Sequence, residues 1–182
     1  QRSLIESFNN CDVLGISREN QRYGYWAIEE EVLNLLDIKS NKFCDMNFHM
    51  EFVKDPNKEE LDASIAKQII SNKDIGVISC FDSSKFLANH NTRVKKWIKM
   101  PIQKDSIFNK KLNKKFYKSV FSAINKNQVD FWIVAAGIHA KIFCNKIKLS
   151  GGIAVDIGSS IDSWNNIYHS RGYLKERFNK AN

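Results

Sequence analysis

The chain lacks any long hydrophobic run, and this absence bears on where the protein works. No apolar stretch approaches the ~20 residues that a membrane-spanning helix needs. The first residues have neither the basic start nor the apolar core of a signal peptide. We therefore expect a cytoplasmic protein without a membrane span.

Proline and closely spaced cysteine are also scarce. With only two prolines in 182 residues, no repeat and no low-complexity stretch, the chain offers no internal linker. We therefore expect one domain over residues 1–182, in which the polar, poorly periodic segment 165–182 is a tail packing near the functional site. The four cysteines are far apart in the sequence and form no Cys-x-x-Cys pair, which predicts free thiols rather than a disulfide or a zinc site.

The common catalytic and nucleotide-binding signatures are missing as well. The sequence has no Gly-x-Ser-x-Gly elbow, no Walker loop and no His-Glu-x-x-His helix. A single glycine turn at Gly137 is an incomplete dinucleotide fingerprint and falls late in the chain, which disfavours a nicotinamide-dependent enzyme.

Acidic residues are outnumbered, so that the formal net charge is +8. The excess lysines gather between residues 95 and 118 and again between 141 and 148. Solvated outer faces of helices are the simpler interpretation, and attraction of an anionic ligand, an anionic polymer or a membrane surface is the functional one. Because aromatic residues are not interleaved with these lysines on a strand platform, we do not expect nucleic acid as a partner. Peripheral membrane association stays open.

Strand-like and helix-like patterns alternate along the chain, which predicts an α/β fold. Connections between parallel strands are right-handed, so the expected architecture is a doubly wound, mainly parallel, Rossmann-like sheet with helices on both faces. The patterns predict strands at 12–17, 75–80 and 97–102, an extended segment at 43–52, helices at 25–36, 86–96 and 111–125, and a helix starting at Asp55-Pro56 with Leu61, Ile65, Ile69 and Ile70 inward.

The segment 130–164 is the most informative part of the chain. An apolar run at 131–136 predicts a buried parallel strand, and Gly137 then opens a helical pattern. Gly151 and Gly152 end that helix before a second apolar run at 153–157, so we expect two neighbouring central strands. The second strand delivers Asp156, Gly158 and Ser159 to the carboxyl edge of the sheet, where open α/β folds bind ligands.

Two features of this segment are candidates for ligand contact. The turn at Gly137 joins a strand to a helix start, which suits a phosphate group, although tight turns also use glycine for steric reasons alone. Asp156 lies within an apolar strand, where a carboxylate is costly unless it is hydrogen-bonded or paired with a cation. Its carboxylate either shapes the turn at Gly158 or contacts a ligand.

Further candidates flank these residues. Ser159 and Ser160 complete the polar loop after the strand, and Asp162, expected in that loop, is either a base or sugar ligand or else a helix N-cap. Arg18 and Arg171 are candidates for a bidentate clamp on a diphosphate, with an ordinary surface arginine as the alternative for each.

The residues of segment 130–164 resemble a known family. An apolar strand ending in Ala-Gly, a helix with Lys141 and Cys144, the run Gly-Gly-Ile-Ala-Val-Asp-Ile-Gly-Ser, and then Asp162 and Trp164 resemble the C-terminal half of bacterial glycosyltransferases with the GT-D type fold. The resemblance implies a sugar-nucleotide donor, a glycan acceptor and a role in surface polysaccharide or glycoconjugate biosynthesis, with Mn²⁺ or Mg²⁺ at the donor. It also implies catalytic roles for Asp162 and for His49, which has a counterpart in a comparable place.

One part of the family pattern is absent from this chain. The glycosyltransferases use an Asp-X-Glu motif after an early strand for metal and sugar-nucleotide binding, and no such motif follows a strand here. We therefore expect the fold without its first βα unit, which either precedes Gln1 in a longer chain or has been lost. This absence supports an alternative function, a non-catalytic α/β module that binds a nucleotide or an anionic glycan within a larger polysaccharide-assembly protein.

Overall fold

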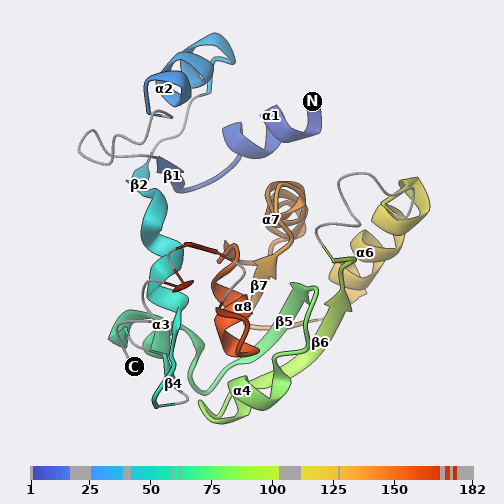
Figure 1. Cartoon of the computed structure of the whole chain (residues 1–182). Helices are drawn as coiled ribbons and strands as arrows, with labels where there is room; N and C mark the ends of the chain where they lie inside the picture. Colours follow the sequence, from blue (N-terminus) through green and yellow to red (C-terminus); the bar gives the residue numbers. More distant parts are fainter. Residues whose placement is uncertain are drawn as a thin grey trace.

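A four-stranded parallel sheet forms the centre of the protein in the computed structural model (Figure 1). The structure describes residues 2–16, 26–38, 42–58, 60–61, 63–102, 112–126, 128–168, 171–172 and 174–175. The strands lie in the order β6 (Arg93–Lys99), β5 (Asp74–Ser79), β7 (Phe131–Ala135) and β8 (Ala154–Asp156), and each neighbouring pair is parallel. The predicted α/β class with a mainly parallel sheet is thus confirmed.

Helices cover both faces of this sheet because its two inner strands are apolar on both faces. Ile75, Val77 and Ile133 point into one hydrophobic cluster with residues of α3 (Ser64–Ile70), α4 (Ser84–Ala88) and α8 (Ser160–Trp164). Ile78 and Trp132 point into the other cluster, with residues of α6 (Lys114–Lys126) and α7 (His139–Leu149). Strands buried on both faces read as continuous apolar runs, which explains the sequence of β5 and β7.

The order of the strands creates a switch point between β5 and β7. Strand β5 connects to β6 on one side through α4, whereas β7 connects to β8 on the other side through α7. The returning connection from β6 to β7 passes through α6, on the opposite face from α4. Ligands of open α/β sheets bind at the carboxyl ends of such diverging strands.

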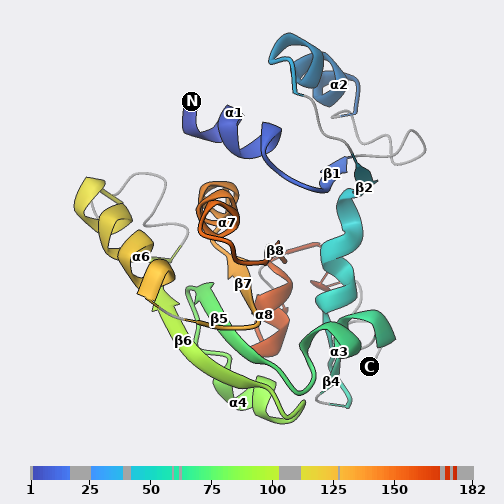
Figure 2. The ribbon, with the colours of Figure 1, turned by 180° about the vertical axis from the view of Figure 1, so that it is seen from behind.

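The N-terminal elements lie on the same side of the molecule as α7 (Figures 1 and 2). They are α1 (Arg2–Asn9), β1 (Leu14–Ile16), α2 (Trp26–Leu35) and β2 (Phe43–Asp45), with β1 parallel to β2. The segment after α1 is fixed to the last turns of α7, because Lys148 Nζ donates to Asn10 O at 2.7 Å and pairs with Asp12 at 2.6 Å. The predicted strand at 12–17 is real but shorter, and the helix predicted at 25–36 is α2.

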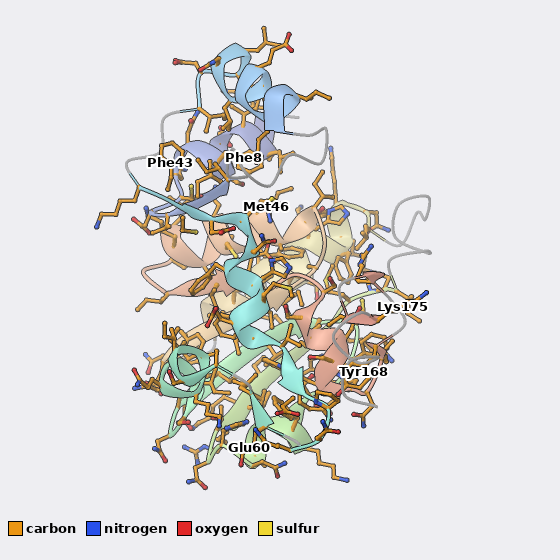
Figure 3. All side chains as sticks on the ribbon, turned by 60° about the vertical axis from the view of Figure 1, so that its left-hand side comes forward. Phe8, Phe43, Met46, Glu60, Tyr168 and Lys175 are labelled. Carbon is orange, nitrogen blue, oxygen red and sulfur yellow. The ribbon has the colours of Figure 1, made fainter. Side chains whose placement is uncertain are left out.

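An exposed apolar surface distinguishes these N-terminal elements. Ile28, Val32 and Leu35 share one face of α2, as their spacing predicts, and all three side chains are exposed. Phe43 and Met46 are exposed at the same end of the molecule, near Phe8 (Figure 3). Within the described ranges, no helix is both long enough and apolar enough to cross a bilayer.

The segment from Phe43 to Ile70 differs from the sequence prediction. Only β2 is extended, because the Asp45 side chain accepts from Asn47 N–H and starts the 3-10 helix η2 (Met46–Phe52). The helix expected from Asp55-Pro56 is instead a hairpin of β3 (Lys54–Asp55) and β4 (Glu60–Leu61), followed by α3. Ala66 and Ile70 face the core, while Ile65, predicted to point inward, is exposed.

Two further corrections concern the edges of the sheet. The helix predicted at 86–96 ends at Ala88, because Asn91 adopts the left-handed conformation at φ 54° and the chain then enters β6, four residues before the predicted strand start. Lysine-rich β6 is an edge strand, where charged side chains remain solvated. Strand β8 neighbours β7 as predicted, but among the described strands it pairs with β7 alone and is therefore an edge strand.

Glycine at position 76 is required by its neighbour in the sheet, which gives a test of the packing. A Cβ atom on Gly76 would lie 2.3 Å from the Trp132 ring. We predict that Gly76→Ala lowers the free energy of unfolding by roughly 1–3 kcal/mol in a denaturant titration, since overpacking displaces the indole. The matched control is Gly172→Ala, where the added methyl group meets nothing within 4 Å. An equal loss when Trp132 is first replaced by Leu would contradict this account.

Candidate functional site at the carboxyl edge of the sheet

The candidate site is built by the loops that leave β5, β7 and β8 at the carboxyl edge. The switch point lies between β5 and β7, one strand away from the β7–β8 position expected from the sequence. Residues after β5 therefore join the site, although no sequence motif marks them. The loop after β7 borders the site in either case, whether the site lies between β5 and β7 or between β7 and β8.

The loop after β5 is held in place by two short-range contacts and one long-range contact. Asp82 Oδ1 accepts hydrogen bonds from the Ser84 N–H at 2.9 Å and the Ser84 hydroxyl at 2.5 Å, which starts α4. Ser83 is buried, and its Oγ accepts from Asn165 Nδ2 at 3.0 Å. The loop after β5 is thereby fixed to the end of α8.

The turn after β7 has the strained geometry that its glycine suggests. Gly137 has φ 55°, and the N–H groups of His139 and Ala140 bond to Ala136 O and Gly137 O as α7 begins. A residue with a side chain is disfavoured at this φ, which accounts for the glycine on steric grounds. The same turn aims the positive end of α7 at the carboxyl edge, where an anionic group is favoured.

Tyr117 and His139 form a hydrogen-bonded pair beside this turn. The Tyr117 hydroxyl lies 2.5 Å from His139 Nδ1, and Tyr117 also packs against Phe121 and Phe143. Burial lowers the pKa of His139 and raises the pKa of Tyr117, so both side chains are uncharged at neutral pH. The pair was not predicted as a site because its members are 22 residues apart in sequence.

Lys141 and Asp156 form an ion pair on the other side of the first turn of α7. Lys141 Nζ contacts Asp156 Oδ2, and Asp156 Oδ1 accepts from Gly158 N–H at 2.9 Å. The carboxylate thus has the turn-shaping role that the sequence offered as one alternative. Burial and the Asp156 carboxylate raise the pKa of the nearby Cys144 thiol to about 12, so that this thiol stays protonated.

A buried polar seam joins α8 to η2 and β3. It consists of hydrogen bonds from Ser160 Oγ to His49 O at 2.5 Å, from Lys54 N to Ser163 Oγ at 2.9 Å, from Trp164 Nε1 to Phe52 O at 2.7 Å, and from Lys54 Nζ to Asn166 Oδ1 at 2.5 Å. Ser160 and Lys54 are fully buried within it. The seam explains why a serine loop far along the chain contacts the segment containing His49.

The seam also shows where the remaining predicted residues lie. His49 Nδ1 is 2.9 Å from Met46 O, within its own helix η2. Asp162 is in the first turn of α8 rather than in a loop, and its carbonyl oxygen accepts from Asn165 and Ile167. Ser159 occupies the position before α8, next to Gly158 with its φ of 51°. His49, Ser160 and Asp162 are therefore brought to the same corner as Asp156.

One of the two predicted arginines lies within the described residues. Arg171 is exposed in the tail, beyond α8, and Arg18 lies outside the described residues. Leu174 of the same tail is fully buried, so this part of the tail packs on the body of the protein. Tyr168 and Lys175 lie on the side of α8 (Figure 3).

The described carboxylates do not fit a ready metal site. Asp156 is engaged by Lys141 and Gly158, and Asp82 accepts from the N–H and the hydroxyl of Ser84. The described residues bring together no group of three histidine, cysteine or acidic side chains that would hold a metal ion. Mg²⁺ and Mn²⁺ prefer several oxygen ligands, part of which substrate phosphates supply in many nucleotide sites.

Comparison with known proteins gives one match. A family model described as a GT-D fold-like domain matches residues 1–164. Neither the curated proteins nor the solved structures include a match to this chain. The match to the model extends from the N-terminal elements to the end of α8 and thus includes the loops that leave β5, β7 and β8.

Removal of the Asp156 carboxylate tests its structural part. Asp156→Ala leaves the Lys141 ammonium and the Gly158 N–H without their acceptor, and we predict a loss of roughly 1–3 kcal/mol in the free energy of unfolding. Thermal and urea melts measure this loss. Asp162→Asn keeps the size of its side chain in a half-exposed position and is expected to cost clearly less. A larger loss in Asp162→Asn than in Asp156→Ala would contradict the assignment.

Proposed function

This chain belongs to the family of GT-D fold-like domains, and from this membership we propose that it is a sugar-nucleotide-dependent glycosyltransferase or a domain of one. Its substrates are a nucleoside-diphosphate sugar and a glycan acceptor, and its role is in surface polysaccharide or glycoconjugate biosynthesis. The donor diphosphate lies at the carboxyl edge, across the turn at Gly137.

One observation carries this proposal. Helix α7 begins at the carboxyl edge of the sheet, where the positive end of its dipole favours an anion, and the Lys141 ammonium lies beside that turn with a carboxylate partner already in place. Transfer of a sugar leaves negative charge on the nucleoside diphosphate. Donors that are fixed in advance stabilise such developing charge more effectively than water does.

The predicted residues take complementary parts in this proposal. Lys141 divides its ammonium between Asp156 and the diphosphate, while Gly158 and Ser159 border the donor on the β8 side. Ser160 acts through the seam, by fixing the backbone at His49. We assign Asp162 and His49 to the sugar end of the donor, and Arg18 and Arg171 to its diphosphate.

A second candidate is a non-catalytic module for an anionic glycan, and a specific surface favours it. Strand β6 and helix α6 contain no acidic residue. Within the part of the chain that the structure describes, five of their lysines form no ion pair. These are Lys96, Lys99, Lys114, Lys115 and Lys118. Such a surface attracts polyanions and anionic membranes alike, so peripheral membrane association belongs to the same candidate.

Lys141 and Lys148 provide a matched test of the donor site. Both are on α7, their side chains are 40% and 42% exposed, and each pairs with one aspartate, Asp156 or Asp12. We predict that Lys141→Met weakens sugar-nucleotide binding about 10-fold to 100-fold, as expected for a lost charge-assisted hydrogen bond. Lys148→Met, at the far end of the helix, is expected to leave the affinity unchanged. Calorimetry with a panel of sugar nucleotides, with and without Mn²⁺ or Mg²⁺, measures both.

The outcomes separate the two candidates. Equal affinities in the two lysine variants would remove the donor from the first turn of α7. If no sugar nucleotide binds while a polyanionic glycan does, and if that binding weakens steeply with salt, the module is the better description. Donor affinity unchanged in a well-folded Asp162→Asn protein would remove Asp162 from the site.

A further inference from the structure

The first turn of α7 has two chemically different sides. Lys141 points toward β8, where it meets Asp156, whereas His139 points toward α6, where it meets Tyr117. Helix α6 begins after β6 and packs with β5 residues such as Ile78 in the same cluster. His139 is therefore on the β5 side of the turn, toward the switch point, and Lys141 is on the opposite side.

The imidazole of His139 is oriented by a single strong contact. Its Nδ1 is 2.5 Å from the Tyr117 hydroxyl, and Tyr117 is held by the rings of Phe121 and Phe143. In the part of the chain that the structure describes, Nε2 has no hydrogen-bond partner and is not enclosed, unlike the buried Nε2 of His90. The contact thus fixes the ring through Nδ1 and leaves Nε2 accessible.

The protonation of this pair suits proton transfer. Burial lowers the pKa of His139 and raises the pKa of Tyr117, and among the described residues no charged group on α6 or α7 is a cause of either shift. Both are neutral at pH 7. When Nδ1–H donates to the Tyr117 oxygen, Nε2 carries a bare lone pair and is an acceptor.

We propose that His139 is the catalytic residue that accepts the proton of the attacking hydroxyl, and that Tyr117 is its positioning residue. The inference rests on the proposed function. The acceptor O–H proton moves to Nε2, the acceptor oxygen forms a bond to the anomeric carbon, and the bond from that carbon to the nucleoside diphosphate breaks. The diphosphate leaves with the electron pair, on the Lys141 side of the turn.

The proton acceptor is thus His139 and not Asp162 or His49, to which the family resemblance assigns catalytic roles. His49 Nδ1 faces a carbonyl of its own helix, and Asp162 lies within α8, beside the seam. Helix α8 packs on the other face of the sheet from α6, where His139 meets Tyr117. His49 and Asp162 keep their proposed place at the donor sugar.

The test measures turnover with water as the acceptor. Wild type, His139→Gln and Tyr117→Phe are incubated with the panel of nucleoside-diphosphate sugars, and release of the nucleoside diphosphate is followed against pH. We expect His139→Gln to lower the rate at least ~100-fold, the lower range for general base catalysis, with donor affinity changed less than about twofold. The wild-type rate rises with pH through the pKa of His139 and levels off, with its midpoint below the ordinary value of 6.5.

A positioning role for Tyr117 has its own readout. Nitrogen-detected NMR of the imidazoles is expected to show His139 with its proton on Nδ1 in wild type, and a redistributed tautomer in Tyr117→Phe with a rate lowered about tenfold. His90, also with a lowered pKa, is the internal reference and is expected not to respond. If His139→Gln unfolds at a clearly lower temperature than wild type, the proposal is tested instead by the pH profile and the His139 tautomer of the folded Tyr117→Phe protein.

Different results would contradict the role of the Tyr117–His139 pair and the proposed function. Donor turnover by His139→Gln within threefold of wild type, or a tautomer unchanged in Tyr117→Phe, overturns the role of this pair and leaves the proposed function standing. Absence of donor binding in wild type overturns the proposed function and the role of His139 together.

Discussion

Burial of β5 and β7 on both faces is the constraint on which the rest of the structure depends. Each strand alternates its apolar side chains between two hydrophobic clusters, and Gly76 makes room for the Trp132 ring on one of those faces. Because neither strand has a polar side, no connection can return along either face except as a helix that covers it. The connections therefore diverge from β5 and β7, and the carboxyl edge between them is left for loops.

The charges at that edge are compensated locally. Lys141 is held by Asp156, Asp156 is held by Lys141 and the Gly158 N–H, and the Tyr117–His139 pair is neutral. The described part of this edge thus combines a paired cation, a helix start and an uncharged proton acceptor. These groups suit a reaction in which a diphosphate leaves while a hydroxyl loses its proton. The excess of lysine on β6 and α6 adds a positive field that attracts anions.

The sequence predicts the fold best where burial is complete. The unit β7–α7–β8 was predicted nearly residue by residue, because apolar runs and glycine turns are local signals. Prediction failed at 43–52, where the Asp45 cap turns the chain into η2, and at 86–96, where Asn91 ends the helix. In both segments a single polar residue outweighs the apolar pattern, and periodicity alone does not show this.

Only the local contacts of the site could be predicted from the sequence. The Asp156–Gly158 contact is local and was one of the alternatives offered by the sequence, whereas the Tyr117–His139 contact depends on how α6 packs on α7. Asp82 lies at the edge of the site only because β5, the strand before it, is the neighbour of β7 in the sheet. Contacts between elements and strand order come from the whole fold, so no local pattern marks these residues.

Amide hydrogen exchange of the wild-type chain, with and without a sugar nucleotide that binds, tests the central claim most directly. The account predicts slower exchange at the loop after β5 and at the first turn of α7, residues 80–84 and 137–141, because the ligand covers the switch point. Exchange that changes only in the N-terminal elements α1 and α2, or only on the exposed faces of β6 and α6, would contradict it.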